Sequence, residues 1–189
     1  MRYETHKNLS SYHTPTPQVV TKAYLLGVLH DSTERKYTYP ISQKSKSYLQ
    51  ILSRGIKLLG FKSWIYKEGK NRNVYILEFS KKLLSEFKIL TSKDKIDYIR
   101  GYFDTDGSIP SLTMSRYYIY FAQKDYKDLG QVKEYLQELD IFCGRLHNPS
   151  SKIDSDYFRF YVLSNSYNKF ATTVGSYHPE KSKRLRMKI

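Results

Sequence analysis

The segment DYIRGYFDTDG (Asp97–Gly107) determines the predicted fold of this chain. Apolar and aromatic residues recur there at helical spacing before an acidic end, and Gly101 lies within the run. An earlier segment, AYLLGVLHD (Ala23–Asp31), carries its own glycine, Gly27, which stands 74 residues before Gly101. Both segments predict a helix whose glycine allows a second helix to approach closely.

The same order of elements follows both segments. Each is followed by β-rich residues that end in a Gln-Lys pair, in ISQK (41–44) and in FAQK (121–124). An amphipathic helix comes next, with Leu49, Leu52 and Ile56 on the apolar face of the first copy and Gly60 as its stop signal. Because every element repeats in order, the chain contains an internal duplication.

Two strands and a short helix close each copy. The first strand pair is Phe61–Tyr66 and Val74–Phe79, joined by a hairpin turn, and the second is Ile141–His147 and Tyr157–Leu163. Ser80 and Ser164 are the expected caps of the closing helices. We therefore expect an α+β fold of two pseudo-symmetric αββαββα halves, with four antiparallel strands per half forming a saddle. Residues 1–92 form the first half and residues 93–189 the second, in one compact unit.

The composition narrows the class of protein. The chain has 32 Lys and Arg against 18 Asp and Glu, a net charge of +14, and 19 tyrosines. A basic surface with aromatic residues on strands suits a nucleic acid. The single cysteine, Cys143, excludes an intramolecular disulfide and a cysteine-based zinc site. The longest apolar run is far shorter than a membrane span and the amino terminus has no signal-peptide core, so we expect a soluble intracellular protein, cytoplasmic or organellar.

The segments around Gly27 and Gly101 resemble the paired motifs of the single-chain LAGLIDADG homing endonucleases. The ISQKS and FAQKD stretches and the tail VGSYHPEKSKRLRMKI (174–189) strengthen the resemblance. It implies two motif helices packed through Gly27 and Gly101, and an antiparallel saddle over the DNA major groove. It also implies a monomer that cuts both strands of a long double-stranded DNA site with Mg²⁺, for which Ca²⁺ or Mn²⁺ can substitute.

The resemblance assigns a catalytic centre to the ends of the two motif helices. Hydrolysis of a phosphodiester needs a hard cation held by carboxylates, and Asp106 and Asp31 are the expected metal ligands and catalytic acids. The duplicated pairs are expected beside them, the glutamines orienting water and the lysines polarising the phosphate: Gln43, Lys44, Gln123 and Lys124.

The first motif departs from the family pattern. Asp106 follows Gly101 by five residues, but the fifth residue after Gly27 is Ser32, with Asp31 one position early. One residue is about 100° around a helix, so Asp31 reaches the position equivalent to Asp106 only where the helix end unwinds. Three interpretations remain open: a double-strand cutter, a nickase with a disabled first half, or a non-catalytic DNA-binding or intron-splicing protein (a maturase) with intron RNA as a partner.

Basic residues in or beside the expected strands are candidate contacts to phosphates or bases, since arginine pairs with guanine and both cations suit phosphate. They are Arg35, Lys36, Lys67, Lys70, Arg72, Arg116, Arg145 and Arg159. The carboxy-terminal basic residues are expected either to hold the DNA backbone or to face solvent: Lys181, Lys183, Arg184, Arg186 and Lys188.

Overall fold

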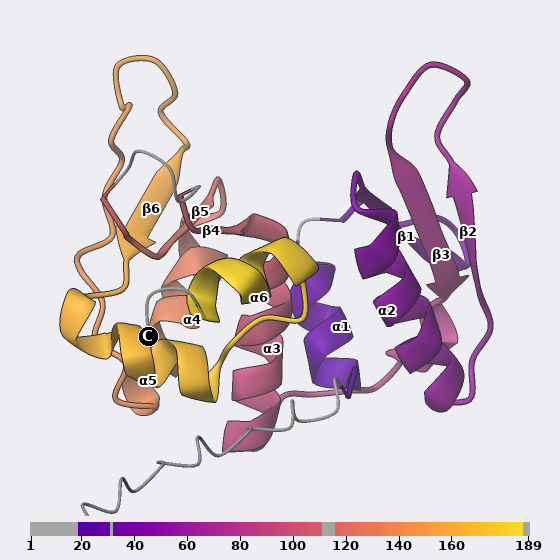
Figure 1. Ribbon diagram of the computed structural model, residues 1–189, viewed down its shortest axis with the longest axis horizontal. Coiled ribbons are helices and arrows are strands. Elements are labelled where there is room, and N and C mark those ends of the chain that lie inside the picture. Colours follow the sequence, from indigo (N-terminus) through magenta and orange to yellow (C-terminus); the bar gives the residue numbers. More distant parts are fainter. Residues whose placement is uncertain (1–18, 31, 111–115, 187–189) are drawn as a thin grey trace, which may run out of the picture.

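Two helices from distant parts of the chain pack side by side at the centre of the molecule (Figure 1). In this computed structural model, residues 19–30, 32–110 and 116–186 are described. The central helices are α1 (Lys22–Val28) and α3 (Ser92–Asp106). Thr21 caps α1 by accepting a hydrogen bond from the Tyr24 amide, and Thr91 forms a capping box with Asp94 at the start of α3.

The two helices meet at their glycines. A Cβ atom added to Gly27 would lie 2.0 Å from the carbonyl oxygen of Tyr98, and one added to Gly101 would lie 2.1 Å from that of Tyr24. These contacts are reciprocal, because Tyr24 and Tyr98 each precede the glycine of their own helix by three residues. Only glycine fits at either position, so the crossing depends on both.

The first sheet lies on the α1 side of the crossing and has the order β1-β3-β2, all antiparallel. Its elements are β1 (Thr38–Gln43), α2 (Lys46–Leu58), β2 (Ser63–Lys67), β3 (Tyr75–Ser80) and the 3₁₀ helix η1 (Lys81–Leu83). Gly60 ends α2 with a positive φ of 85°. We call residues 19–91 the N-terminal half.

The second sheet has the order β4-β5-β6, also antiparallel, on the α3 side (Figure 1). Its elements are β4 (Gly107–Ser108), β5 (Tyr120–Gln123), α4 (Tyr126–Glu138), β6 (Phe158–Tyr161), η2 (Ser164–Ser166), α5 (Tyr167–Thr173) and α6 (Pro179–Arg186). We call residues 92–186 the C-terminal half. The expected α+β class is confirmed, with the repeated elements in the expected order.

The expected four strands per half are wrong, because each sheet has three strands within the described residues. In the N-terminal half, residues 32–37 form no strand, since the connection from α1 to β1 is short. In the C-terminal half, the strand expected at Ile141–His147 is reduced to isolated bridges at Cys143 and His147. Gly144 lies between these bridges, where a glycine weakens strand pairing.

The closing helices also differ from expectation in one place. Ser80 caps η1 by accepting from the Lys82 amide, as expected. Ser164 caps nothing, because Leu163 occupies the N-cap of η2 and makes no side-chain hydrogen bond. The α-helical part of this closing segment is α5, which begins at Tyr167.

Each half buries its own hydrophobic core. In the N-terminal half Leu25 of α1 packs with Leu52 and Phe79, and in the C-terminal half Phe103 of α3 packs with Phe121. Each motif helix therefore belongs to the core of its own half. The glycine crossing brings the carboxyl ends of both helices to the middle of the molecule. On the same side rise two arms, which we call the N-terminal arm (residues 63–80) and the C-terminal arm (residues 143–161) (Figure 1).

Candidate catalytic centre and nucleic-acid interface

Asp106, the last residue of α3, lines a pocket of about 330 Å³ between the carboxyl ends of α1 and α3 and strand β1. Its side chain is 33% exposed. The pocket lining comes from both halves and consists of Val28, Ser32, Thr33, Pro40, Ile41, Ser42, Gln43, Thr105 and Asp106. The crossing of the motif helices therefore builds one shared pocket with a single carboxylate in its described lining.

His30 contacts this carboxylate from α1's side of the crossing. Its Nε2 lies 2.6 Å from Oδ2 of Asp106, and its side chain is only 1% exposed. The ring stacks on Tyr102 with centroids 3.6 Å apart, and Nδ1 lies 2.9 Å from the carbonyl oxygen of Gly27. Since a carbonyl only accepts, Nδ1 is the donor in that contact. His30 and Asp106 therefore meet across the two halves, and they form an ion pair when the His30 ring is protonated on both nitrogens.

The sequence does not reveal His30 as part of this centre. It is 76 residues from Asp106 in the chain, and dispersed histidines carry no metal-site spacing. The available signal is its position in the repeat, because His30 occupies the place of Asp104 in the second motif. Only the crossing at Gly27 and Gly101 brings the two side chains together.

The duplicated Gln-Lys pairs separate in space. Gln43 lines the pocket, and Nε2 of Gln123 lies 3.0 Å from Nε2 of His30, so both glutamines reach the centre. The lysines lie farther out: Lys44 is exposed, and Nζ of Lys124 lies 3.7 Å from a carboxylate oxygen of Asp154. The structure thus brings Gln43 to the pocket and Gln123 to His30 beside it, and neither lysine lines the pocket.

The acid of the first motif, Asp31, lies outside the described residues. Ser32, which stands where the repeat would place that acid, lines the pocket. Glu34 forms an ion pair with Lys81 in the N-terminal half. Within the described lining, the candidate metal donors are therefore the Asp106 carboxylate and the hydroxyl groups of Ser32, Thr33, Ser42 and Thr105.

Helix α6 supports the end of α3 that carries Asp106. The Lys181 ammonium donates to the carbonyl oxygens of Phe103 at 2.7 Å, Asp104 at 3.0 Å, Thr105 at 3.3 Å and Gly107 at 2.6 Å. Carbonyls at a helix carboxyl end have no intrahelical hydrogen-bond donor and carry partial negative charge. A buried ammonium group supplies the missing donors and compensates that charge. Burial lowers the pKa of Lys181 to about 8, although Asp104 and Asp106 act in the opposite direction.

Asp104 fastens the segment that leads into α6. Its buried carboxylate accepts from the amides of Tyr177 at 2.8 Å and His178 at 3.2 Å, from the Ser176 hydroxyl, and from the Tyr24 hydroxyl at 2.6 Å. Burial raises the pKa of Asp104, and these hydrogen bonds oppose the rise. The carboxylate therefore joins α3, α1 and the segment before α6.

Some of the carboxy-terminal basic residues support the chain's own backbone, and others are exposed. Lys181 and Arg184 bind backbone carbonyls of their own chain, Arg184 donating to Ile109 at 2.9 Å. Lys183 and Arg186 are exposed, and Lys188 lies outside the described residues. The sequence left the choice between DNA contact and solvent open, and the structure adds a third role, support of the motif helix.

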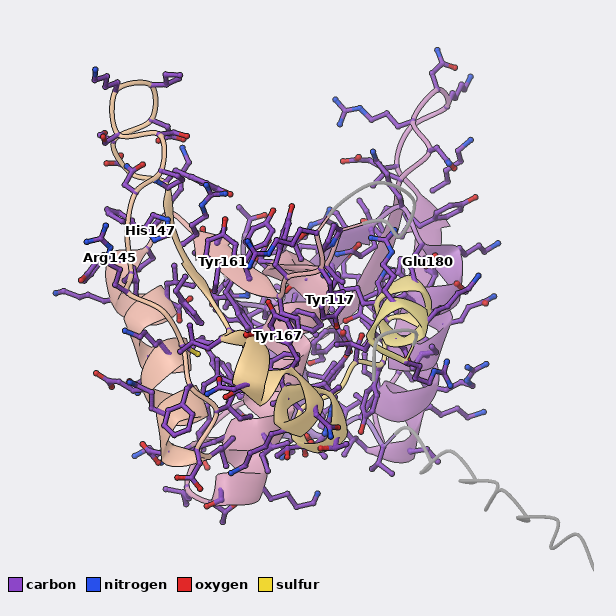
Figure 2. The ribbon with its side chains drawn as sticks, turned by 60° about the vertical axis from the view of Figure 1, so that its left-hand side comes forward. Tyr117, Arg145, His147, Tyr161, Tyr167 and Glu180 are labelled. Atoms are coloured by element: carbon purple, nitrogen blue, oxygen red, sulfur yellow. The ribbon has the colours of Figure 1, made fainter. Side chains whose placement is uncertain are left out.

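The candidate DNA-contacting residues lie on and around the two arms, which Figure 2 shows rising on either side of the centre. Arg35 pairs with Glu78 at 2.8 Å, Arg72 pairs with Glu68 at 3.3 Å, and Arg159 lies over the Tyr161 ring. Figure 2 shows His147 and Tyr161 on the C-terminal arm, where their rings stack 6.1 Å apart. The remaining candidates are mostly exposed: Lys36, Lys67, Lys70, Arg116 and Arg145.

Comparisons with known proteins match this geometry. The profile of the LAGLIDADG-like domain family matches residues 94–175. No curated protein matches the sequence. Among solved structures, the chain is similar to I-DmoI in complex with DNA and Mn, with a TM-score of 0.61 and 21% identity over 82% of this chain and 95% of that one.

Two further solved structures carry the same fold. I-DmoI in complex with DNA and Ca matches with a TM-score of 0.64 and 19% identity, covering 88% of this chain and 96% of that one. The N-terminal LAGLIDADG domain of WhiA matches with a TM-score of 0.62 and 17% identity, covering 82% and 81% of the two chains. Across residues 19–30, 32–110 and 116–186, no helix combines the length and apolar character that crossing a membrane requires.

Proposed function

Since residues 94–175 form a LAGLIDADG-like domain and the chain has the fold of the single-chain LAGLIDADG homing endonucleases, we propose that it is a site-specific DNA endonuclease. It acts inside the cell as a monomer on a long double-stranded DNA target and hydrolyses phosphodiester bonds with a divalent metal ion. The observation that carries this proposal is the Asp106 carboxylate, which lines a pocket built by residues of both halves.

The pocket fits a hard divalent cation. The Asp106 carboxylate is a donor that Mg²⁺ prefers, and Mg²⁺ usually binds through one or two carboxylates with water or phosphate oxygens completing its coordination. Asp106 would hold Mg²⁺, or Mn²⁺ or Ca²⁺ in its place, and Asp31 is the proposed second ligand. The cation supplies an activated water and stabilises the leaving oxygen.

The other residues of the centre act on water and on the carboxylate. Gln43 would offer its amide group to water molecules in the pocket and Gln123 would act beside it, while the exposed Lys44 and Lys124 would meet DNA phosphates. The Gly27–Gly101 crossing sets the distance between the two helix ends. His30 positions Asp106 through its Nε2 contact.

A nickase, or a DNA-binding or intron-splicing protein on the same fold, is the second candidate. It is favoured by the single carboxylate in the described pocket lining and by the Ser32 hydroxyl in the place of the repeated acid. A hydroxyl is a poorer ligand than a carboxylate for a hard cation. Under this candidate the arms bind DNA, or intron RNA, without cutting both strands.

The test is cleavage of a supercoiled plasmid library with genomic and randomised inserts, in Mg²⁺, with sequencing of the new ends. The matched variants are Asp106→Asn and Asp140→Asn; Asp140 is 79% exposed, and asparagine tolerates its positive φ. We expect linear products that share one long site, lost in Asp106→Asn and kept in Asp140→Asn. Open circles alone would establish the nickase, and intact plasmid with specific binding would establish the non-catalytic role.

A further inference from the structure

The outward face of the first sheet carries a buried carboxylate, that of Glu78 on β3. Its neighbours Leu77 and Phe79 are fully buried in the core, so Glu78 lies on the opposite face of the strand. In the register it pairs with Pro40 on β1 and with Trp64 on β2, and it is only 5% exposed. A buried charge in the middle of an outward face needs partners.

Three side chains donate hydrogen bonds to this carboxylate. Arg35 donates from NH1 to Oε2 at 2.8 Å, the Tyr66 hydroxyl donates to Oε2 at 3.1 Å, and the Thr38 hydroxyl donates to Oε1. Burial raises the pKa of Glu78, but the hydrogen bonds from Thr38, Tyr66 and Arg35 outweigh it and hold the pKa below its usual value. Glu78 is therefore ionised at neutral pH and anchors the Arg35 guanidinium.

Arg35 keeps most of its binding capacity. Its side chain is 50% exposed, and the contact with Glu78 uses one of the five N–H donors of the guanidinium. The remaining donors suit the O6 and N7 acceptors of guanine. An arginine already held in place loses less side-chain freedom on binding, which favours a specific contact.

The carboxylate that holds Arg35 is buried, and this distinguishes the pair from that of Arg72, whose acidic partner is partly exposed. A guanidinium held by a buried partner is restricted in orientation, as a contact with one base edge requires. Arg72, near the tip of the same arm, has a side chain that is 73% exposed and pairs with a partly exposed Glu68 at 3.3 Å. Arg72 suits a phosphate contact, whereas Arg35 suits a base.

The second sheet has no such arrangement at the equivalent positions. Pro40 and Tyr120 each stand three residues before the glutamine that ends their strand, and their cross-strand partners are Glu78 and Tyr161. Around Tyr161 lie the rings of Tyr118 and Tyr120, with centroids 5.8 Å and 5.7 Å away. An aromatic cluster thus replaces the carboxylate, and the arginine beside it, Arg159, lies over the Tyr161 ring instead of against an acid.

We propose that Arg35, held by Glu78, reads one guanine in the half of the DNA target that faces the first sheet. The proposal rests on the proposed DNA binding and is independent of cleavage. It makes Arg35 a specificity-determining residue and Glu78 its positioning residue. At the equivalent place in the other half of the target, no arginine with a buried carboxylate selects guanine.

The experiment is selection of bound sequences from a randomised double-stranded DNA library in Ca²⁺, with wild type, Arg35→Ala, Glu78→Gln and the control Arg72→Ala. We expect Arg35→Ala and Glu78→Gln to relax the same single G·C pair, each by roughly 5- to 150-fold in binding discrimination. Arg72→Ala should weaken binding of all sequences alike and reduce the salt-dependence slope by about 1. Thermal unfolding of each variant accompanies the selection.

Several results would overturn the proposal. In one, Arg35→Ala leaves the selected profile unchanged or weakens all sequences alike, as a phosphate contact would. In another, Glu78→Gln blurs every position of the half-site, as a structural role would. If the wild-type protein selects a defined site in which no guanine depends on Arg35, this inference alone is overturned. If the wild-type protein selects no sequence at all, the proposed function is overturned as well.

Discussion

The N-terminal and C-terminal halves share their scaffold and differ in the groups that they present to the shared pocket and to the outward faces of their sheets. Both halves have a glycine at the crossing and a glutamine at the end of a strand, β1 or β5, that leads into a capped helix. At the pocket, however, α3 presents Asp106, whereas the segment after α1 presents Ser32 and places His30 against the Asp106 carboxylate. A duplicated scaffold thus tolerates divergence where packing does not constrain the side chain.

The ends of the two motif helices also differ in support. The end of α3 is held by Lys181 and by the bonds of Asp104 to the segment before α6. Helix α1 ends at Val28, and His30 returns to the Gly27 carbonyl. The difference teaches that the half that presents Asp106 to the pocket is also the half that α6 stabilises.

The largest expected effect comes from removing the two acids separately. Asp106→Asn removes a charged ligand and should reduce cleavage by on the order of 10²–10³-fold while DNA binding is kept. Asp31→Asn should do the same if the first half supplies the second ligand. Strand-specific nicking assays and binding titrations check both variants.

The two variants, Asp106→Asn and Asp31→Asn, also test how the halves differ in catalysis. Double-strand cleavage retained in Asp31→Asn would remove Asp31 from the catalytic assignment and leave the N-terminal half without a catalytic acid. Loss of cutting on one strand only would show that each half serves its own strand. The control is Asp140→Asn, which should cleave like wild type.

The next effect concerns the crossing that both halves need. Gly101→Ala forces a Cβ to within 2.1 Å of the Tyr24 carbonyl oxygen, so the helices must separate, and we expect a loss of about 2–4 kcal/mol of unfolding free energy. Gly130→Ala, in α4 with open space around the added atom, should be neutral or stabilising by up to about 1 kcal/mol. Chemical denaturation measures both. Equal stability of the two variants would contradict the close crossing.

A smaller effect tests the support of α3 alone. Lys181→Met leaves buried carbonyls without their donor, and we expect a loss of about 1–3 kcal/mol together with faster amide exchange at the end of α3. Exchange at α1 should change little. Lys183→Met, an exposed neighbour on the same helix, is the matched control. Unchanged exchange at residues 103–107 would show that α6 does not hold the helix end.

The smallest expected effect is on the stability of the protein at acidic pH, which distinguishes the first sheet from the second. Because the pKa of Glu78 is held below its ordinary value of 4.5, its contribution to stability is present above that pH and is lost as the pH falls through the lowered value. The thermal unfolding temperature of wild type should therefore fall more steeply below pH 4.5 than that of Glu78→Gln. Tyr161→Phe, at the equivalent position of the second sheet, should keep the wild-type acid dependence. Parallel curves for wild type and Glu78→Gln would contradict the buried ion pair.

The sequence by itself determined the duplication, the α+β class and the residues that recur in both copies. Periodic apolar residues, Gly27, Gly101 and the turn glycines act locally or in simple repeats, so their consequences can be read along the chain. The strand count was less predictable: whether Ile141–His147 forms a continuous strand depends on its pairing partner, and pairing is a tertiary property.

Only the tertiary structure decided which distant groups meet. His30 reaches Asp106, Lys181 reaches the end of α3, and the Arg35 guanidinium reaches the carboxylate of Glu78 across separations of 76, 78 and 43 residues. None of these pairs has a local spacing signal, because each contact follows from a helix crossing, the path of the carboxy-terminal segment or a strand register. Side-chain identities were available in the sequence, but the electrostatic partners that set their roles are fixed by packing.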